Sequence, residues 1–298
     1  MTAPTSAPPT PERILQRIDW SILRRLDGVL QGNHRTLFTG VGTDFNDLRE
    51  YQPEDDVRHI DWNVTARTNT PHVRQFLEDR ELTAWFLVDR SPSMGFGVPG
   101  QSKELALAEL VAALARLIIR DGDRVGAMLF DNTAQRTVPP RSSRNQVLLL
   151  ARELLRPPEP SDRTTALGDL LAEAVLTIRR PSLVIVVSDF ISEPGWERAL
   201  RLLARKHEVL AIRITDPTER RLPDAGVVVL QDAETGEQLT VDTGDPELRR
   251  RYEAAAAQRA DQIHTAIRDA GADTFELSSD EDLGGALIRL ARHRRKRR

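Results

Sequence analysis

The chain contains no cysteine, and this absence excludes disulfide bonds, thiolate metal sites and cysteine nucleophiles. No apolar run reaches the roughly 18 uninterrupted residues that a membrane-spanning helix requires. The N-terminal segment M-T-A-P-T-S-A-P-P-T-P lacks the basic and apolar regions of a signal peptide. The remaining composition, 40% apolar and 29% charged, is that of a folded globular protein. We therefore expect a cytoplasmic protein.

Several signatures of catalysis are also missing. The sequence has no G-x-S-x-G elbow, no H-E-x-x-H pair and no P-loop, and its six histidines are scattered without a pair at metal-ligand spacing. These absences argue against the common hydrolase, zinc-protease and nucleotide-binding sites. We therefore do not expect an enzyme.

Apolar runs typical of strands alternate with amphipathic helical segments, and this alternation predicts an α/β protein. The expected fold is a doubly wound, mainly parallel sheet of the Rossmann-like type with helices on both faces. Strands are expected at 72–78, 82–88, 125–130, 183–187, 209–214 and 274–277, with 135–138 pairing beside 125–130. Helices are expected at 103–120, 145–155, 165–179, 196–206, 248–270 and 283–292.

The order of segments suggests a division of the chain. We predict a disordered leader at 1–10, an N-terminal helical and extended flanking region at 11–80, and an α/β domain at 81–292. The domain carries a β-hairpin inserted at about 222–243, and a basic tail of solvated residues closes the chain at 293–298. The first helix, capped by Thr10, has one apolar stripe and is expected to pack on the main domain.

A dense polar segment between 44 and 68 belongs to the flanking region. Asp55 or Asp56 is expected to cap a short helix that carries Val57, Ile60 and Val64, with Trp62 as a further candidate. Opposite charges in this segment predict an ion-pair network, formed by Arg49, Asp56, Arg58, Asp61 and Arg67.

The most informative stretch is L-T-A-W-F-L-V-D-R-S-P-S-M-G-F at 82–96. Its apolar run reads as a buried strand that ends at Asp89, with hydroxyls following at Ser91 and Ser93. Ligands of open α/β sheets bind beyond the carboxyl ends of the strands, where these three side chains would lie. A carboxylate and two hydroxyls supply the hard oxygens that Mg²⁺ prefers, so the stretch predicts a metal site.

Two other places extend this site. Asp189 ends the apolar strand at 183–187, as Asp89 ends its own strand, and Thr165 begins a helix after a proline-rich loop. If the two strands are neighbours, both carboxylates and a loop hydroxyl could enclose one octahedral cation. Thr164 competes with Thr165 for the hydroxyl position. The predicted ligands are thus Asp89, Ser91, Ser93, Thr165 and Asp189, for Mg²⁺ with Mn²⁺ or Ca²⁺ as alternatives.

These residues resemble the metal-ion-dependent adhesion site of von Willebrand factor A domains. In that family a D-x-S-x-S loop, a threonine on a second loop and an aspartate at the end of a third segment hold Mg²⁺. Asp89, Ser91 and Ser93 match the first element, Thr165 in R-T-T-A-L-G the second, and Asp189 in V-V-S-D-F the third. Arg163 and Thr164 stand where that family usually has two glycines.

The upstream segment also carries a resemblance. R-E-Y at 49–51, D-D-V-R-H-I-D-W at 55–62 and A-R at 66–67 are similar to the bacterial domain-of-unknown-function family 58. Members of that family carry a von Willebrand A-like domain and tend to occur beside MoxR-type AAA+ ATPases. The resemblance covers roughly residues 35–290 and implies a protein partner of the MoxR type.

Three functions follow as hypotheses. The first is a Mg²⁺-dependent protein-binding module, an adaptor of a MoxR-type ATPase in assembly or cofactor maturation, whose partner supplies an acidic side chain to the metal. The second is a phosphotransfer enzyme using Asp89, although the position two residues on holds Ser91 instead of the expected acid. The third is a structural protein that binds anionic surfaces through the basic tail. We expect no specific nucleic-acid ligand, because no aromatic residue interleaves the basic ones.

Overall fold

The computed structural model describes residues 10–18, 48–52, 57, 60–74, 81–98, 101–131, 135–157, 166–232 and 236–296. They belong to two compact units. The first unit comprises Met1–Phe38 and Thr83–Arg298, and the second comprises Thr39–Leu82. Within the described ranges no helix is long and apolar enough to cross a membrane.

A six-stranded sheet forms the centre of the first unit, with the strand order β12-β9-β8-β3-β6-β7. Neighbouring strands run parallel except β7, which pairs antiparallel with β6 at the edge. The strands are β3 (Thr83–Asp89), β6 (Arg124–Phe130), β7 (Gln135–Arg141), β8 (Leu183–Ser188), β9 (Glu208–Thr215) and β12 (Asp273–Ser278). The predicted mainly parallel α/β sheet is confirmed.

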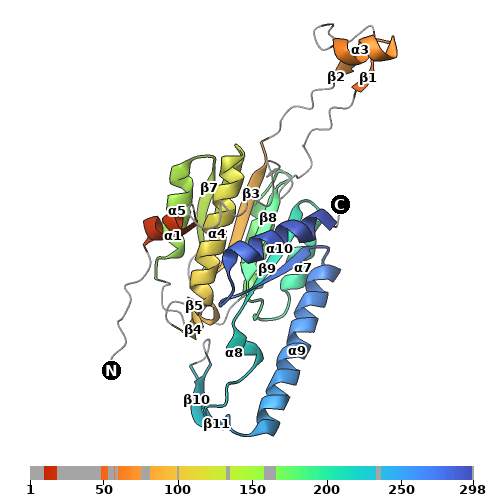
Figure 1. Ribbon diagram of the computed structural model, residues 1–298. Helices are drawn as coiled ribbons and strands as arrows, with labels where there is room; N and C mark the ends of the chain where they lie inside the picture. Colours follow the sequence, from red (N-terminus) through yellow and green to blue (C-terminus); the bar gives the residue numbers. More distant parts are fainter. Residues whose placement is uncertain are drawn as a thin grey trace. The chain divides into compact units, whose positions relative to one another are not determined.

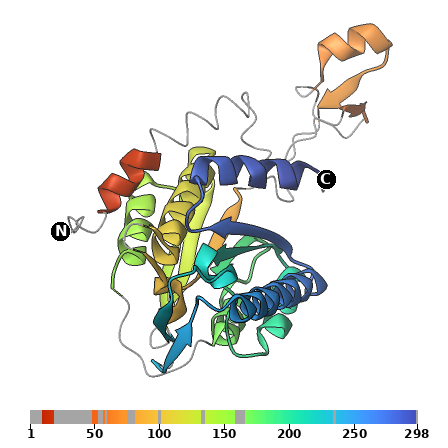
Figure 2. The same ribbon diagram turned by 60° about the horizontal axis from the view of Figure 1, so that its bottom comes forward.

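Helices cover both faces of this sheet (Figure 1, Figure 2). One layer contains α1 (Pro11–Arg17), α4 (Lys103–Arg120), α5 (Arg144–Leu154) and α10 (Leu283–Lys296). The other contains α6 (Leu167–Thr177), α7 (Trp196–Ala204) and α9 (Pro246–Asp269). The sheet is therefore doubly wound, as predicted, and α1 packs on the main domain through its buried apolar stripe.

Strand β3 lies in the middle of the sheet and is buried on both faces. Its odd-numbered side chains, Trp85 and Leu87, join the apolar cluster made with α6, α7 and α9. Phe86, between them, is fully buried and points to the opposite face, because successive strand side chains alternate. Burial on two faces explains why the segment reads as a continuous apolar run.

The chain reverses its direction of winding at β3. From β3 it crosses through α4 to β6 on one side, and it later returns to place β8 on the other side. In open α/β sheets this arrangement leaves a crevice beyond the carboxyl ends of the two strands at the reversal. The topology therefore positions a site at the ends of β3 and β8.

Short elements surround this carboxyl edge. The 3₁₀ helix η4 (Pro92–Gly95) and the small hairpin of β4 (Gly97–Val98) and β5 (Gln101–Ser102) connect β3 to α4. The four-residue helix α8 (Pro217–Arg220) follows β9. It leads into the inserted hairpin of β10 (Val227–Gln231) and β11 (Gln238–Asp242), which forms a separate two-stranded sheet.

The second unit contains β1 (Leu48–Glu50) and β2 (His72–Arg74), paired antiparallel, and α3 (Trp62–Thr68). The helix that was expected to carry Val57, Ile60 and Val64 together is not one helix, and its expected caps, Asp55 and Asp56, lie outside the described residues. Asp61 caps α3 by accepting bonds from the N–H groups of Asn63 and Val64, and Ile60 forms an isolated bridge with Val73 instead of joining the helix. Trp62 is the first residue of α3, and its side chain is 69% exposed.

The remaining residues of the predicted ion-pair network lie partly beyond the described part of this unit. Asp56 and Arg58 fall outside it, as does the side chain of Arg49. The network therefore stays a prediction.

The basic C-terminal segment differs from the expected solvated tail. Helix α10 continues to Lys296, and Arg294 is only 5% exposed, with its guanidinium paired to Glu208 at the start of β9. A buried guanidinium needs a counter-charge, and the carboxylate of Glu208 supplies it. At least this arginine is thus part of the packed domain.

The two faces of α6 provide a test of the described core. Leu171 is fully buried against the sheet, whereas Leu176 on the same helix is 69% exposed. We expect Leu171→Ala to lower the free energy of unfolding by about 2–5 kcal/mol, because it removes buried methyl groups and leaves a cavity. Leu176→Ala should change it by no more than about 0.5 kcal/mol. Urea denaturation measures both values, and equal losses would contradict the assigned packing.

Candidate metal site

Two aspartates meet at the carboxyl edge of the sheet. Asp89 is the last residue of β3, and Asp189 directly follows β8, which pairs with β3 in parallel register. The hydroxyl of Ser188 donates a hydrogen bond of 2.6 Å to Oδ2 of Asp89 and so links the two strand ends. All three side chains are buried. The structure thus brings together the two strand-end carboxylates that the sequence predicted.

The loop after β3 folds its hydroxyls toward Asp89. The N–H of Ser91 donates to Oδ1 of Asp89 at 2.9 Å, which turns the chain back beside the carboxylate. The Oγ atoms of Ser91 and Ser93 lie 3.0 Å apart, and both side chains are buried. Asp89, Ser91 and Ser93 therefore form one cluster of hard oxygen atoms, as expected.

The loop after β8 is held in a fixed conformation. Phe190 has a φ of 59°, a left-handed backbone that a large side chain seldom adopts. Its N–H donates to Ser188 Oγ at 2.8 Å, and the N–H of Ile191 donates to Oδ1 of Asp189 at 2.8 Å. The ring of Phe190 packs edge-on against Trp196 at 5.2 Å between centroids. These contacts stabilise the backbone that presents Asp189.

A lysine that the sequence analysis did not assign to the site lies beside Asp189. Lys103, the first residue of α4, is fully buried, and its Nζ donates to Oδ2 of Asp189 at 2.7 Å and to Oε1 of Glu219 on α8. Burial acts to lower the pKa of Lys103, but the charges of Asp189 and Glu219 outweigh it and raise that pKa above its ordinary value. Lys103 is therefore a permanent cation at neutral pH.

Asp89 lacks such a counter-charge. Among the ion pairs found in the described ranges, none includes Asp89. Burial, and then the nearby negative charge of Asp189, raise the pKa of Asp89 to about 6, although hydrogen bonds from Ser188 and Ser91 act to lower it. The arrangement leaves one buried carboxylate whose charged form is poorly stabilised by the protein itself.

The donor set fits a small hard cation. Within the described residues no three His, Asp or Glu side chains gather closely enough to hold a metal, so a cation here would rely on hydroxyls and waters besides carboxylates. Mg²⁺ tolerates such a shell, because it usually keeps several waters. Asp89, Ser91 and Ser93 are the residues present that would hold it. Asp189 lies next to them with Oδ2 directed to Lys103, and Thr165 and its rival Thr164 lie outside the described residues.

Three residues of this edge, Ser188, Lys103 and Glu219, were not among the predicted ligands. Ser188 follows Val187, which pairs with Val88, so Ser188 lies beside Asp89 and its hydroxyl reaches that carboxylate. Lys103 carried a signal, because it is one of three lysines in a chain with 39 arginines and begins the helix that follows the D-x-S-x-S loop. Glu219 belongs to α8, a helix too short to show in the apolar pattern.

Comparison with known proteins identifies the family. A family model described as "Protein of unknown function DUF58" matches residues 47–262. An uncharacterised protein of Mycobacterium tuberculosis is 40% identical over 290 residues, which cover 95% of this chain and 89% of the relative. The chain belongs to the DUF58 family. The DUF58 match covers most of the second unit and most of the α/β unit, and it confirms the resemblance carried by the segment at 49–67.

Solved structures provide more distant likenesses. The conserved hypothetical protein BatB from Bacteroides thetaiotaomicron is 17% identical, with a TM-score of 0.46, and the match covers 72% of this chain and 99% of BatB. A von Willebrand factor type A protein from Catenulispora acidiphila is 12% identical, with a TM-score of 0.35, over 76% of this chain and 43% of that chain. We therefore describe the fold of this DUF58 protein from its own strand order and helix layers, and not from these structures.

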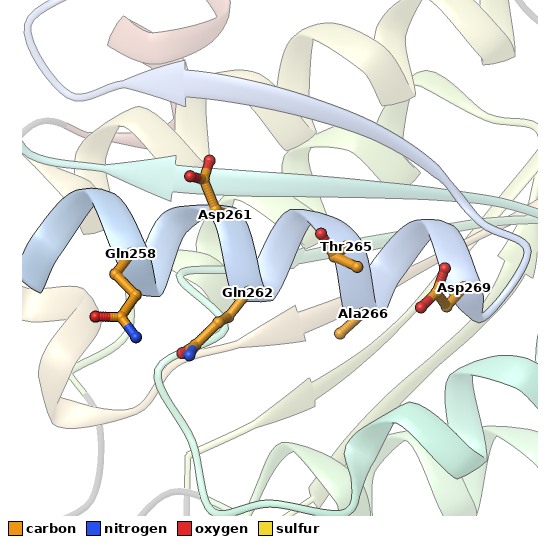
Figure 3. Close-up of a pocket in the computed structure, with 6 residues that line it drawn as sticks. All are labelled: Gln258, Asp261, Gln262, Thr265, Ala266 and Asp269. Carbon is orange, nitrogen blue, oxygen red and sulfur yellow. The ribbon is translucent and has the colours of Figure 1, made fainter.

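A groove on α9 contributes nothing to this site. Its lining consists of Gln258, Asp261, Gln262, Thr265, Ala266 and Asp269, which lie along one helix (Figure 3). Side chains at this spacing form one face of a single helix. The groove therefore gathers no functional groups from different elements.

The raised pKa of Asp89 predicts a pH dependence of stability. The folded metal-free protein holds the Asp89 proton more tightly than the unfolded chain, so stability from this residue is present at low pH and is lost as pH rises from about 4 to about 7. Asp89→Asn cannot ionise, so its free energy of unfolding should rise relative to wild type by about 1–3 kcal/mol across this window.

Urea denaturation in metal-free buffer at a series of pH values measures this difference. Asp261→Asn, at an exposed position on α9, is the control and should follow the wild-type profile. Parallel profiles for wild type and Asp89→Asn would show that burial does not perturb Asp89.

Proposed function

We propose that this DUF58 protein is a protein-binding module that holds a divalent cation, Mg²⁺ in the first place, at Asp89, Ser91 and Ser93. One observation carries the proposal: two buried aspartates lie on neighbouring strand ends, and within the described part of the chain Asp189 is paired with a cation, Lys103, whereas Asp89 is not. A buried carboxylate without a counter-charge is costly, and a bound cation would remove that cost.

The residues have distinct roles in the proposed site. Asp89 contributes the formal negative charge, and Ser91 and Ser93 contribute neutral oxygens. We assign Thr165 to the second loop as a further ligand and Asp189 to the outer edge of the site. When bound, the cation would supply a positive centre with exchangeable positions, open to an acidic side chain of a partner.

The route to this centre passes the D-x-S-x-S loop. Gly95, Phe96 and Gly97 are exposed and follow Ser93 after the buried Met94, whereas Asp89 itself is 1% exposed. A partner would therefore contact the loop first and reach the cation from the side of Ser93. This geometry supports recognition of a protein surface better than capture of a small substrate.

The inserted hairpin supports a protein partner independently. Val227 and Val229 lie on one face of the hairpin and are 70% and 60% exposed, and Leu239 lies with its partner Leu230 on the other face and is 65% exposed. Exposed apolar side chains on both faces favour an interaction site. In Figure 1 the hairpin extends from the end of the α/β unit at which α8 and β4–β5 lie, which is the end of the candidate site. The segment 222–248 has seven acidic residues and no Lys or Arg, so its partner surface should be apolar and basic.

We propose a MoxR-type AAA+ ATPase as the partner and a role as its adaptor in assembly or cofactor maturation of other proteins. The proposal of this partner rests on the family resemblance of the segment at 49–67 and of the D-x-S-x-S loop. An adaptor needs an exposed contact surface and a switchable site rather than a set of catalytic groups. The cation site and the hairpin would meet these two needs.

Mg²⁺ should stabilise the wild-type protein, because a ligand that binds only the folded state lowers its free energy. At a concentration of about 100 times Kd the gain is about 2.7 kcal/mol. Thermal unfolding with and without Mg²⁺ measures it. Asp89→Asn should abolish the gain, whereas Asp169→Asn, at an exposed position on α6, should keep it. An equal gain in the Asp89 variant would place the cation elsewhere.

Binding to the ATPase should depend on the same residue. Immobilised MoxR-type ATPase from the same bacterium should retain wild-type protein in Mg²⁺ and release it in chelator. Asp89→Ala should be retained weakly in both buffers, because the site cannot hold the cation. If Asp89→Ala bound as tightly as wild type in both conditions, the proposed mechanism of binding would be wrong.

The hairpin should contribute to that interface without contributing to stability. A Val227→Ser/Val229→Ser double variant should weaken binding by about tenfold or more if these side chains are among the dominant contacts. Its urea denaturation curve should stay close to that of wild type, because both side chains are exposed. Leu176→Ser, an exposed apolar position on α6, is the matched control and should bind normally. Unchanged binding in the double variant would remove the hairpin from the interface.

A further inference from the structure

Lys103 is the most unusual charged residue of the carboxyl edge. Its side chain is 0% exposed, and it lies at the first position of α4, immediately after the β4–β5 hairpin. Its single ammonium group pairs with two carboxylates from separate elements, Asp189 after β8 and Glu219 on α8, and lies 5.9 Å from the ring centroid of Phe96. The ammonium group of Lys103 is thus shared between Asp189, at the candidate site, and Glu219, on a helix outside it.

The backbone of Asp189 is fixed, whereas one of its carboxylate oxygens has an exchangeable partner. The main-chain carbonyl accepts a bond of 3.2 Å from Arg213 Nε, and Oδ1 accepts from the N–H of Ile191. Oδ2 bonds to Lys103 alone among the hydrogen bonds found in the described residues. A change of partner at Oδ2 therefore requires no movement of the strand.

We propose that Lys103 is a positioning residue that competes with the bound cation for the carboxylate of Asp189. The result of this competition changes the Lys103–Glu219 ion pair, and Glu219 lies on α8. The inference rests on the proposed cation site at Asp89, Ser91 and Ser93. Without the cation, Lys103 neutralises Asp189. With the cation bound, the carboxylate of Asp189 interacts with two positive charges. Lys103 then pairs less with Asp189 and more with Glu219.

Glu219 is placed to receive this change. While Oε1 pairs with Lys103, Oε2 accepts a bond of 3.1 Å from the N–H of Asp216, and Asp216 in turn caps α8. The same carboxylate therefore holds both the lysine and the first turn of α8. Because α8 leads into the β10–β11 hairpin, a shift in the Lys103 pairing alters the support of the exposed hairpin.

Lysine suits this role better than arginine does. Its ammonium is a compact charge with three donors that can rotate between acceptors, whereas a guanidinium binds carboxylates in a fixed fork. The chain uses arginine at 39 of its 42 Lys and Arg positions, so lysine at 103 departs from its general composition. We attribute the lysine at this position to the need for a cation that can change between the carboxylates of Asp189 and Glu219.

Calorimetric titration of the full chain with Mg²⁺ at neutral pH tests the competition. Lys103→Met should bind Mg²⁺ at least about fivefold more tightly, the lower end of common coupling between sites, because Asp189 is released to the cation. Glu219→Gln should bind more weakly, because Lys103 then pairs with Asp189 alone. Lys206→Met, an exposed lysine near β9, is the matched control and should match wild type.

A double variant separates transmission through Lys103 from a simple effect of charge at a distance. In the Lys103→Met background, Glu219→Gln should no longer change the Mg²⁺ affinity, because its effect acts through the lysine. Additive effects of the two substitutions would overturn the inference. If Lys103→Met does not fold, Glu219→Gln and Lys103→Arg decide the question. Both should weaken Mg²⁺ binding, the second because a guanidinium held in a fixed fork does not release Asp189 to the cation.

Hydrogen exchange distinguishes this role from a purely structural one, because a lysine with only a structural role would not make the exchange rates of α8 depend on Mg²⁺. Mg²⁺ should change the exchange rates of the α8 amides at Thr218–Arg220 in wild type but not in Asp89→Asn or Glu219→Gln. Two failures are distinguishable. Wild type that binds no Mg²⁺ contradicts the proposed function, whereas wild type that binds Mg²⁺ with the affinity of every Lys103 and Glu219 variant contradicts this inference alone.

Discussion

Two buried carboxylates lie at the carboxyl edge of the sheet, and within the described residues a positive counter-charge is bonded to one of them and not to the other. The arrangement of this edge depends on that difference. Asp89 and Asp189 lie on adjacent strands, linked by the hydroxyl of Ser188, and repel each other in a region from which water is largely excluded. The only cation bonded to either of them through its carboxylate, within the described ranges, is Lys103, and it serves Asp189. Asp89 is left with hydroxyl and N–H partners, which stabilise a charge less than a cation does.

The topology of the sheet creates this pairing. Because the chain places β6 on one side of β3 and β8 on the other, the ends of β3 and β8 become neighbours although about a hundred residues separate them. The apolar layers on both faces hold the strands, and α4 brings Lys103 back to the same edge from the start of its helix. Thus the core, rather than any local motif, determines how closely the charged groups approach.

The same edge connects the site to the inserted hairpin of β10 and β11. Glu219 links Lys103 to α8, and α8 precedes an acidic hairpin whose apolar side chains remain exposed. A two-stranded sheet with unpaired edges is stable only with support, and here that support comes from its base, where Thr243 bonds to Gly226 and Ala225. In this DUF58 protein, the exposed hairpin and the candidate cation site therefore belong to one continuous structure.

Most of the fold was determined by the sequence alone, because apolar periodicity reports local burial directly. The strands at 82–88 and 183–187, the helix at 103–120 and the inserted hairpin were all predicted within a few residues, and the D-x-S-x-S loop placed Asp89, Ser91 and Ser93 correctly at a strand end. Where periodicity was weak, as between 44 and 68, the sequence did not separate Ile60 from the helix of Val64, because only backbone geometry shows that Asp61 caps α3 and that Ile60 forms a bridge with Val73.

What the tertiary structure alone decided is which charges meet. Nothing in the spacing of Lys103, Asp189 and Glu219 relates them, since they come from three elements that only the winding of the sheet brings together. The same is true of Arg294, which composition assigned to a solvated tail and packing placed against Glu208. Pairing between distant charges depends on distances of a few ångströms, which hydrophobic patterns do not encode, whereas the strand ends that carry the charges follow from those patterns.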